Sequence, residues 1–407
     1  MKKILPICGT VVLAAAMMAA PAAQSAPKEK VIYSFAFGEA DGAAPQGGVI
    51  RDAQGNLYGT TQGGEGGGCG GGGCGTVFKV TPKGKETILH GFTGADGAYP
   101  VPGLAIDAAG NLYGTAIVGG PIHHCACGVV FKVTPDGAFS IVHAFRGGAD
   151  GSHPVGGLIF DKRGDLIGTT GSGGNDCTGT GEGCGTVFRI KPDGRKEVLH
   201  AFDGAGGIYP ESDLTLDGSG NIYGTTANGG SDCDGTGQGC GVVFKLAHDG
   251  TETVLYAFAG GSNGAYPTGG VVMDDAGTLY GTTNNGGIDC DGSGGCGTVY
   301  KLASDGTETG LHSFAGGNDG AHPRDTLVMD GAGHMYGTAV EGGGENDGGV
   351  VFKIKPNGKE RILYAFTGGN DGGGPFSGLI MDASGSLYGT TFTGGLYSYG
   401  TVFKLKP

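Results

Sequence analysis

The sequence is short of positive charge, lacks tryptophan and, beyond its first 26 residues, contains no long apolar run. Lysine and arginine total 25 against 39 acidic residues, so the formal net charge is −14 at pH 7. Because the electrostatic field of a negatively charged protein repels phosphate groups, the composition argues against nucleic acid and anionic membrane surfaces as partners. No segment after residue 26 approaches the roughly 18 continuous apolar residues that a spanning helix needs. The sequence therefore predicts no membrane span.

Common catalytic signatures are absent as well. The chain has no HExxH zinc-protease motif and no Gly-x-Ser-x-Gly nucleophile elbow. Its glycine-rich stretches are too frequent for any one of them to identify a phosphate-binding loop. A catalytic site, if the protein has one, must be sought in departures from the repeated pattern described below.

The N-terminus has the pattern of a secretory signal peptide. Lys2 and Lys3 precede an apolar stretch from Ile4 to Ala20, and small residues follow through Ala26. This pattern predicts cleavage of residues 1–26 and export of residues 27–407 to the periplasm or the medium.

Glycine is abundant, with 94 residues beside 17 prolines, and without periodicity such a composition would indicate disorder. The chain instead repeats one pattern seven times: a strand-like run ending in Asp, a turn, Leu-Tyr-Gly-Thr-Thr, a glycine-rich loop, Val-Phe-Lys, a second turn and Val-Leu-His-Ala-Phe. The aspartates that mark the copies are Asp52, Asp107, Asp161, Asp217, Asp274, Asp330 and Asp382. A period of roughly 55 residues suits one four-stranded blade of a radial array.

The third copy illustrates the predicted blade, with strands over residues 157–161, 165–170, 185–190 and 197–202 separated by two tight turns and one long loop. The mature chain starts with an isolated fourth strand at 31–35 and stops after an isolated third strand at 401–405. We therefore predict an all-β, seven-bladed β-propeller of four antiparallel strands per blade, in which the N-terminal strand completes the last blade and leaves no exposed sheet edge. Residues 27–407 would form one domain, expected to be monomeric. The missing tryptophan argues against the Trp-motif blades of quinoprotein dehydrogenases.

The two faces of such a ring are unequal. One carries short turns, whereas the other carries Gly-Gly-x-Asp-Gly-Ala-x-Pro segments and the long Gly/Cys loops. Function usually resides on long, variable loops, so the second face is the predicted functional face.

Two motifs recur in every copy: residues 56–61 (Asn-Leu-Tyr-Gly-Thr-Thr) and residues 75–79 (Gly-Thr-Val-Phe-Lys) represent them in the first. In these motifs the chain resembles the GloVer-type glycine-rich tandem-repeat proteins, over essentially all of the mature sequence. The resemblance implies a bacterial envelope or secreted protein, and it transfers no established activity.

Ten cysteines lie in five pairs, each within one long loop. In an oxidising compartment we expect disulfides in the four wider pairs, which are Cys69/Cys74, Cys177/Cys184, Cys233/Cys240 and Cys290/Cys296. Cys125 and Cys127 are only two residues apart, near the upper Cα distance limit for a bridge in extended chain. Whether they are bridged stays open.

Two kinds of loop could bind metal. The cluster His123, His124, Cys125 and Cys127 offers soft or borderline ligands, although a strained or unpaired cysteine pair fits equally well. Acidic loops place carboxylates beside hydroxyls and turn glycines, as calcium ligation requires, but solvated turns explain them too. The residues concerned are Asp232, Asp234, Asp289 and Asp291.

Two interruptions of the repeat mark candidate catalytic residues. Glu211 and Asp213 in one copy, and Arg324 and Asp325 in another, replace the usual small residues after proline. If both segments face the channel mouth, the carboxylates could act as acid, base or metal ligands while Arg324 orients an anion. Ordinary variation on a solvated rim is the alternative.

Four histidines, His90, His143, His200 and His312, occupy a fourth-strand position that holds tyrosine in the other copies. A position shared by planar rings predicts packing between blades with a polar tip.

Our leading hypothesis is an exported, non-catalytic binding or scaffold propeller whose stiffened loops contact an extracellular carbohydrate or protein. The alternative is an extracellular hydrolase or lyase with an acidic site at the channel mouth, assisted by calcium.

Overall fold

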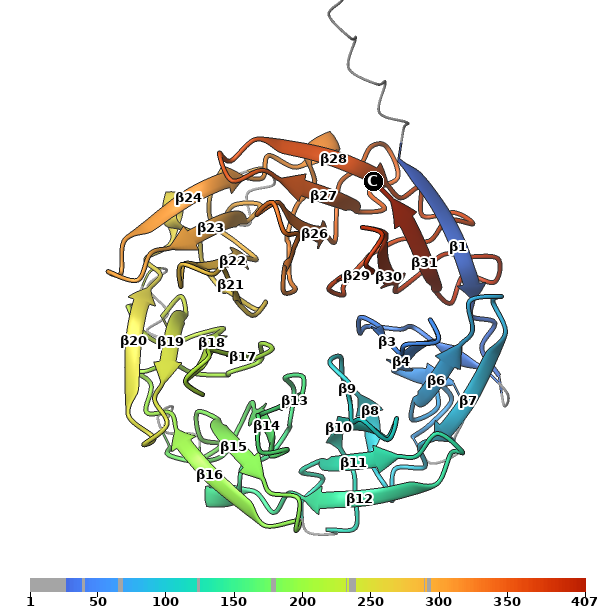
Figure 1. Cartoon of the computed structure of the whole chain (residues 1–407), viewed down its shortest axis with the longest axis vertical. Helices are drawn as coiled ribbons and strands as arrows, with labels where there is room; N and C mark the ends of the chain where they lie inside the picture. The colour runs from blue at the N-terminus through green and yellow to red at the C-terminus, as the bar shows by residue number, and fades with distance from the viewer. Residues whose placement is uncertain are drawn as a thin grey trace, which may run out of the picture.

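The computed structural model describes residues 27–38, 41–64, 69–122, 125–176, 181–231, 233, 239–288, 290 and 294–407. The predicted signal peptide lies outside these residues. Seven antiparallel blades of four strands each, the second with the extra strand β8 (Ala98–Pro100) at its edge, surround a central opening (Figure 1). The chain is therefore an all-β, seven-bladed β-propeller, as its repeats predict.

Each blade runs from an inner two-residue strand to a long outer strand (Figure 1). Blades 1 to 3 comprise β3 (Ile50–Arg51), β4 (Leu57–Thr61), β6 (Thr76–Val80) and β7 (Glu86–Gly91); β9 (Ala105–Ile106), β10 (Leu112–Val118), β11 (Val129–Val133) and β12 (Phe139–Ala144); and β13 (Ile159–Phe160), β14 (Leu166–Thr170), β15 (Thr186–Ile190) and β16 (Lys196–Ala201). Blades 4 to 6 comprise β17 (Thr215–Leu216), β18 (Ile222–Thr226), β19 (Val242–Leu246) and β20 (Glu252–Ala257); β21 (Val272–Met273), β22 (Leu279–Thr283), β23 (Thr298–Leu302) and β24 (Glu308–Ser313); and β25 (Val328–Met329), β26 (Met335–Ala339), β27 (Val350–Ile354) and β28 (Glu360–Ala365). Short extra elements lie in the connections: β2 (Gly42–Ala43), β5 (Gly63–Gly64), β8 (Ala98–Pro100), η1 (Gly148–Asp150), η2 (Gly261–Asn263) and η3 (Gly317–Asp319).

The seventh blade joins the two ends of the propeller. It consists of β29 (Ile380–Met381), β30 (Leu387–Thr391), β31 (Thr401–Lys406) and the first strand of the chain, β1 (Lys28–Ser34). β1 pairs antiparallel with β31 from Lys28↔Lys406 to Ser34↔Thr401 (Figure 1). This pairing confirms the predicted closure and gives the last sheet its outer strand.

Aromatic pairs fill the spaces between blades. In every gap a phenylalanine that follows an outer strand meets the third-strand aromatic of the next blade edge to face, and all the rings are buried. The seven pairs, with centroids 5.1–5.3 Å apart, are Phe35–Phe78, Phe92–Phe131, Phe145–Phe188, Phe202–Phe244, Phe258–Tyr300, Phe314–Phe352 and Phe366–Phe403. The core is therefore a ring of inter-blade clusters, which explains why each copy keeps the same aromatic positions.

The glycine of the repeated Tyr-Gly-Thr segment is required by this packing. A Cβ atom on Gly59 would lie 2.6 Å from the ring of Phe78 on the neighbouring strand. The following threonine then links blades, since the Thr390 hydroxyl donates to the carbonyl oxygen of Gly47 at 2.8 Å. Thr60 reaches Val101 in the same way at 3.0 Å.

The aspartate that marks each copy closes the turn between the first two strands. The Asp52 carboxylate accepts hydrogen bonds from the Asn56 backbone N–H at 2.8 Å and from the Tyr58 hydroxyl at 2.9 Å. Across the described ranges, no helix combines the length and apolarity needed to cross a membrane.

Candidate functional site: the channel and the loop face

The connections divide between two faces because neighbouring strands are antiparallel. Short turns lie at one end of the strands, and the loops after the second and fourth strands lie at the other. We call this second end the loop face. Both acidic interruptions of the repeat occur where inner strands leave the loop face, so they lie at the mouth of the central channel.

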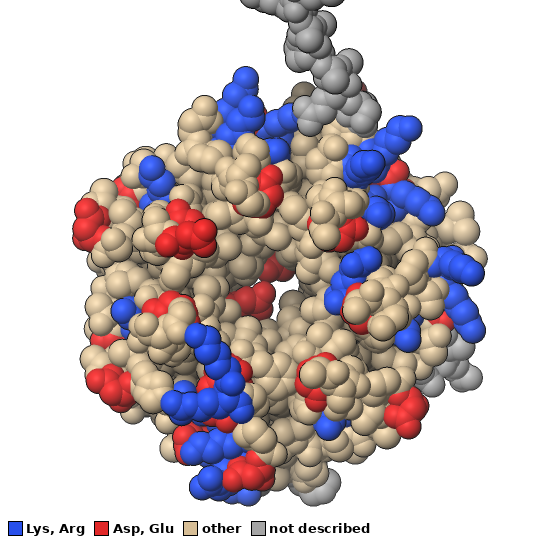
Figure 2. Space-filling model, in the orientation of Figure 1, with Lys and Arg blue, Asp and Glu red and all other residues tan. Residues whose placement is uncertain are grey.

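Inner strands of six blades line a channel cavity of about 330 Å³, and Asp213 and Asp325 are part of its lining. The space-filling view shows acidic atoms inside this opening (Figure 2). The structure thus places both predicted carboxylates in the channel rather than on the outer surface.

Backbone N–H groups and one hydroxyl group from blades 3, 6 and 7 hold the two carboxylates. Asp213 accepts a hydrogen bond from the Gly157 N–H at 3.0 Å and another from the Thr326 hydroxyl at 3.5 Å. Asp325 accepts bonds from the N–H groups of Thr326, at 2.6 Å, and Gly378. Each carboxylate therefore bridges a gap between blades while it faces the cavity.

The environment of the channel favours the protonated forms. Desolvation raises the pKa of Asp325 to about 7, and the negative charge of Asp213 adds to the rise. Desolvation raises the pKa of Asp213 too, although the hydrogen bonds from Gly157 and Thr326 lower it in part. Because the carboxyl groups interact, they titrate as a pair that holds a proton near neutral pH.

Glu211 and Arg324 lie on the exposed rim rather than inside. Desolvation by surrounding atoms raises the pKa of Glu211, and the positive charge of Arg324 opposes the rise. Arg324 donates from Nε to the Asn284 side-chain oxygen at 3.0 Å, and its guanidinium lies 5.6 Å from the ring centre of Phe376. The four predicted residues therefore form two layers, with a half-buried acid pair below a charged rim.

A second feature of the loop face is an aromatic patch on blade 7, which we define as Phe37, Leu396, Tyr397 and Tyr399. Phe37 and Tyr399 stack with centroids 5.1 Å apart. Tyr397 and Leu396 are 53% and 65% exposed. In blade 7 this short loop replaces the Gly/Cys loop of blades 1–5, so the patch is a departure from the repeat. Tyr99 is also exposed, whereas Tyr209 and Tyr266 pack against core clusters.

Disulfides close the loops of several blades. The structure joins Cys69 to Cys74, Cys125 to Cys127, Cys233 to Cys240 and Cys290 to Cys296. The Cα atoms of Cys125 and Cys127 are 5.1 Å apart, because the chain bends where extended geometry would place them farther apart. Three of the four wider pairs are therefore bridged as predicted, and the narrow pair is bridged as well.

The fourth wider pair, Cys177/Cys184, is described at one end only. Cys184 is fully buried in the cluster between blades 3 and 4, and it is disulfide-bonded. Its backbone carbonyl oxygen accepts a hydrogen bond from the Tyr209 N–H at 3.1 Å, which fixes it at the base of the loop. Cys177, its predicted partner, lies outside the described residues, so the pairing of Cys184 with Cys177 stays a prediction.

Most of the predicted metal ligands lie outside the residues that the structure describes. These are His123, His124, Asp232, Asp234, Asp289 and Asp291. Of the soft cluster, the structure describes Cys125 and Cys127, whose disulfide leaves no thiolate for a metal in this form. Among the described residues, no group of three His, Cys, Asp or Glu side chains has a metal-binding arrangement.

The fourth-strand histidines form polar pairs with the loop aspartates, a relationship that sequence reasoning missed. His90 lies 3.0 Å from Asp96, and it stacks on Phe139 of the next blade with centroids 3.8 Å apart. In blade 3, where glycine replaces the aspartate, His200 contacts Glu252 of the next blade at 3.2 Å. The recurrence of both residue types at fixed spacing was the signal that could have revealed the pairing.

Fold and repeat together define a β-propeller of the glycine-rich tandem-repeat class. The profile of the Gloeobacter/Verrucomicrobia repeat family matches residues 21–238, 126–294 and 233–407, and the chain belongs to this family. No curated protein of similar sequence was found.

Solved structures resemble the fold. A gluconolactonase from Xanthomonas campestris is 17% identical over 75% of this chain and 84% of its own, with a TM-score of 0.42. A luciferin-regenerating enzyme is 15% identical over 75% and 90% of the two chains, with a TM-score of 0.43. At these identities and TM-scores the likeness carries no argument about the activity of this chain.

Proposed function

We propose that the protein is an exported, non-catalytic binding module whose loop face holds an extracellular carbohydrate. The aromatic patch of blade 7 carries the proposal. Phe37 and Tyr399 present a stacked pair beside two more exposed side chains, Leu396 and Tyr397. Isolated apolar residues are common on protein surfaces, but a cluster of large, rigid side chains on a loop face is characteristic of binding sites.

A neutral carbohydrate suits this surface better than a charged polymer. One face of a pyranose ring consists largely of C–H groups, which pack on an exposed aromatic ring. The tyrosine hydroxyls can then exchange hydrogen bonds with sugar hydroxyls at the edge of the ring. The net charge of −14 disfavours polyanions, which removes acidic polysaccharides from the first choice.

The test is binding to a panel of neutral polysaccharides by affinity electrophoresis or calorimetry, with the Y397A/Y399A variant alongside the parent protein. We expect the variant to bind at least about tenfold more weakly, since truncation of a central aromatic anchor costs about 2 kcal/mol. Tyr99→Ala removes an exposed tyrosine outside the patch and should retain binding. Equal binding by all three proteins, or binding of a protein partner alone, would contradict the carbohydrate assignment.

A second candidate, an extracellular hydrolase or lyase, is favoured by one observation. Asp325 is a carboxyl group with a pKa of about 7 that faces a cavity, which suits a general acid or base at neutral pH. In this role Asp213 would keep Asp325 protonated, and Glu211 and Arg324 would contact substrate at the rim. The competing role is structural, since both carboxylates already bridge blades.

Turnover of a panel of lactones and glycosides, with and without calcium, distinguishes the two functions. If the channel is catalytic, Asp325→Asn should lower kcat about 100-fold or more while the fold stays intact. Turnover that the substitution leaves unchanged would remove the channel as the active site.

A further inference from the structure

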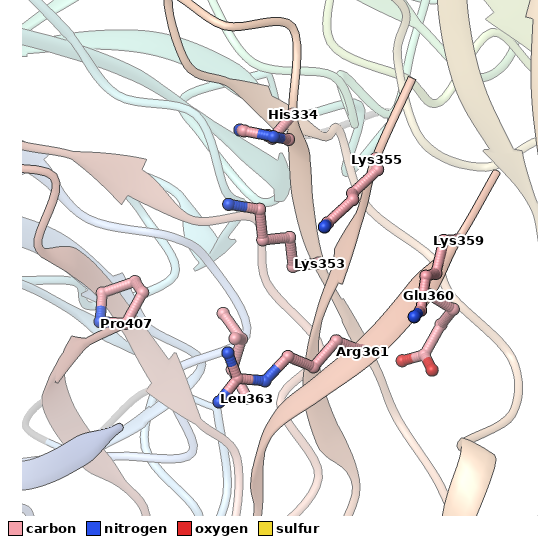
Figure 3. A pocket seen from close by; sticks show the side chains of 8 residues that line it. All are labelled: His334, Lys353, Lys355, Lys359, Glu360, Arg361, Leu363 and Pro407. Carbon is pink, nitrogen blue, oxygen red and sulfur yellow. The ribbon is translucent and has the colours of Figure 1, made fainter. Parts of the chain in front are cut away.

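A pocket on the turn side of blade 6 carries an unusual concentration of positive charge. It encloses about 400 Å³, and its lining includes His334, Lys353, Lys355, Lys359 and Arg361. The amines of Lys353 and Lys355 and the guanidinium of Arg361 point into the same space, with the His334 ring beside them (Figure 3). This pocket is separate from the loop face because it lies at the opposite end of the strands.

The register of the sheet brings these charges together. Lys353 on β27 pairs directly with Arg361 on β28, so two like charges lie side by side on the same face. Such a cross-strand pair is unfavourable unless an anion lies between the two groups. Desolvation lowers the pKa of Lys353, and the charges of Lys355 and Arg361 add to the decrease, while Asp330 opposes it.

Among the described residues, no carboxylate lies within ion-pair distance of Lys353, Lys355, Lys359 or Arg361. Glu360 belongs to the same strand, but successive side chains alternate between faces. Glu360 also lines the pocket, but its carboxylate lies apart from the guanidinium of Arg361 (Figure 3). Asp330 accepts hydrogen bonds from His334 and from the Tyr336 hydroxyl, at 2.8 and 3.0 Å.

Blade 3 provides an internal comparison, because it has a similar set of cations at the corresponding positions. There each cation has an acidic partner: Arg189 with Asp165 at 3.5 Å, Lys191 with Glu197 at 2.5 Å and Arg195 with Asp193 at 2.8 Å. In blade 6 the corresponding cations are Lys353, Lys355 and Lys359, whereas the three acids are replaced by His334, Asn357 and Arg361. The fold is the same and all three acidic partners are gone, although blade 6 also has Glu360 where blade 3 has Lys196.

We propose that this pocket binds a dianionic oxyanion, a phosphate or sulfate group, between Arg361 and the amines of Lys353 and Lys355. The fork of guanidinium donors matches two oxygens of a tetrahedral anion, and lysine amines act as mobile point charges on the remaining oxygens. The ligand relieves the like-charge contact between β27 and β28. Free phosphate, free sulfate and a phosphate ester of a small molecule share this chemistry.

Isothermal titration of the purified protein at low ionic strength tests the site, with inorganic phosphate, inorganic sulfate and glucose 6-phosphate as separate probes. We expect saturable binding of at least one probe with one site per chain, weakened by added sodium chloride. Tighter binding of the ester than of both inorganic ions would identify an esterified ligand, and the reverse a free ion. Absence of saturable binding for all three would overturn the proposal.

A substitution that copies blade 3 distinguishes a specific binding site from a general effect of the protein's net charge. Arg361→Glu restores the acid found at Glu197 and should lower affinity at least tenfold without loss of thermal stability, because it creates ion pairs. Lys83→Glu makes the same change of charge at an exposed turn of blade 1 and should leave affinity unchanged. Equal losses in the two variants, or none in R361E, would contradict the site.

The reciprocal change in blade 3 tests whether the absence of acidic partners is what allows the pocket of blade 6 to bind an anion. The double variant D193N/E197R removes two of the acidic partners there. If uncompensated cations make the site, this variant should show a second binding event with the same probe. A folded double variant that retains a single event would contradict that explanation.

Discussion

Asp325 and Gly378 belong to neighbouring blades, and the backbone N–H of Gly378 donates a hydrogen bond to the Asp325 carboxylate. The carboxylate thus links blades 6 and 7 at the point where it enters the channel cavity. Desolvation, with the nearby charge of Asp213 adding to it, raises the pKa of Asp325 to about 7, so this carboxyl group carries a proton near neutral pH. Asp325 therefore both joins two blades and titrates near neutral pH.

The raised pKa of Asp325 in the folded protein predicts that the free energy of unfolding falls as the pH rises. In the unfolded chain Asp325 loses its proton near pH 4, but in the folded chain only near pH 7. Between these values the folded state binds more protons, so the free energy of unfolding decreases with pH. After allowance for solvent in the channel, we expect a decrease of about 1–2 kcal/mol between pH 5 and 8 in urea denaturation.

Asp325→Asn should remove a clear part of this decrease, whereas Asp249→Asn at an exposed turn should leave it unchanged. Glu29 and Glu360 contribute in the same direction, since desolvation and a nearby aspartate raise the pKa of each to about 7. A D325N variant with the full parental pH dependence would refute the assignment to Asp325.

Phe35 and Phe37 are two residues apart, but their truncation to alanine should affect stability very differently. Phe35 is fully buried and packs on Phe78 across the gap that closes the ring, whereas Phe37 is 38% exposed in the aromatic patch. We expect Phe35→Ala to lower the free energy of unfolding by about 3–5 kcal/mol and Phe37→Ala by less than about 0.5 kcal/mol. Chemical denaturation measures both, and similar losses would show that the closing contact is not structural.

Gly206 should tolerate aspartate only when its neighbour changes. A Cβ atom at Gly206 would meet the Glu252 carboxylate, which already pairs with His200. We expect Gly206→Asp to cost about 1–2 kcal/mol, and G206D/E252K to recover about 1 kcal/mol by copying the contact of Lys196 with Asp150. A double-mutant cycle measures this coupling, and strictly additive losses would exclude it.

The loop disulfides should contribute modestly to stability. Replacement of Cys290 and Cys296 by alanine opens a short loop, for which the loop-closure relation predicts a loss of about 2 kcal/mol. Thermal denaturation of C290A/C296A measures this loss. Intact mass after alkylation of the unreduced parent protein checks the premise, because any alkylated Cys290 or Cys296 would contradict it.

Sequence reasoning reached the architecture because the relevant information is local and repeated. Alternation, turn residues and the Tyr-Gly-Thr segment recur in every copy, so errors in one copy are corrected by the others. It also selected Asp213 and Asp325 as departures from the repeat, and the structure places both in one cavity. It did not identify Gly157, Thr326 and Gly378 as the groups that hold them, since glycine is too common to single out.

Seven blades, the closure of β1 on β31 and the division into a turn face and a loop face follow from the order of strands in the sequence alone. Only the tertiary structure decided which side chains meet across that order. Phe37 and Tyr399 come from opposite ends of the chain, and they stack because the ring closes. The charge of the blade 6 pocket depends on the register of β27 and β28, which places Lys353 opposite Arg361. Local patterns determine elements, whereas sites depend on distances that only packing sets.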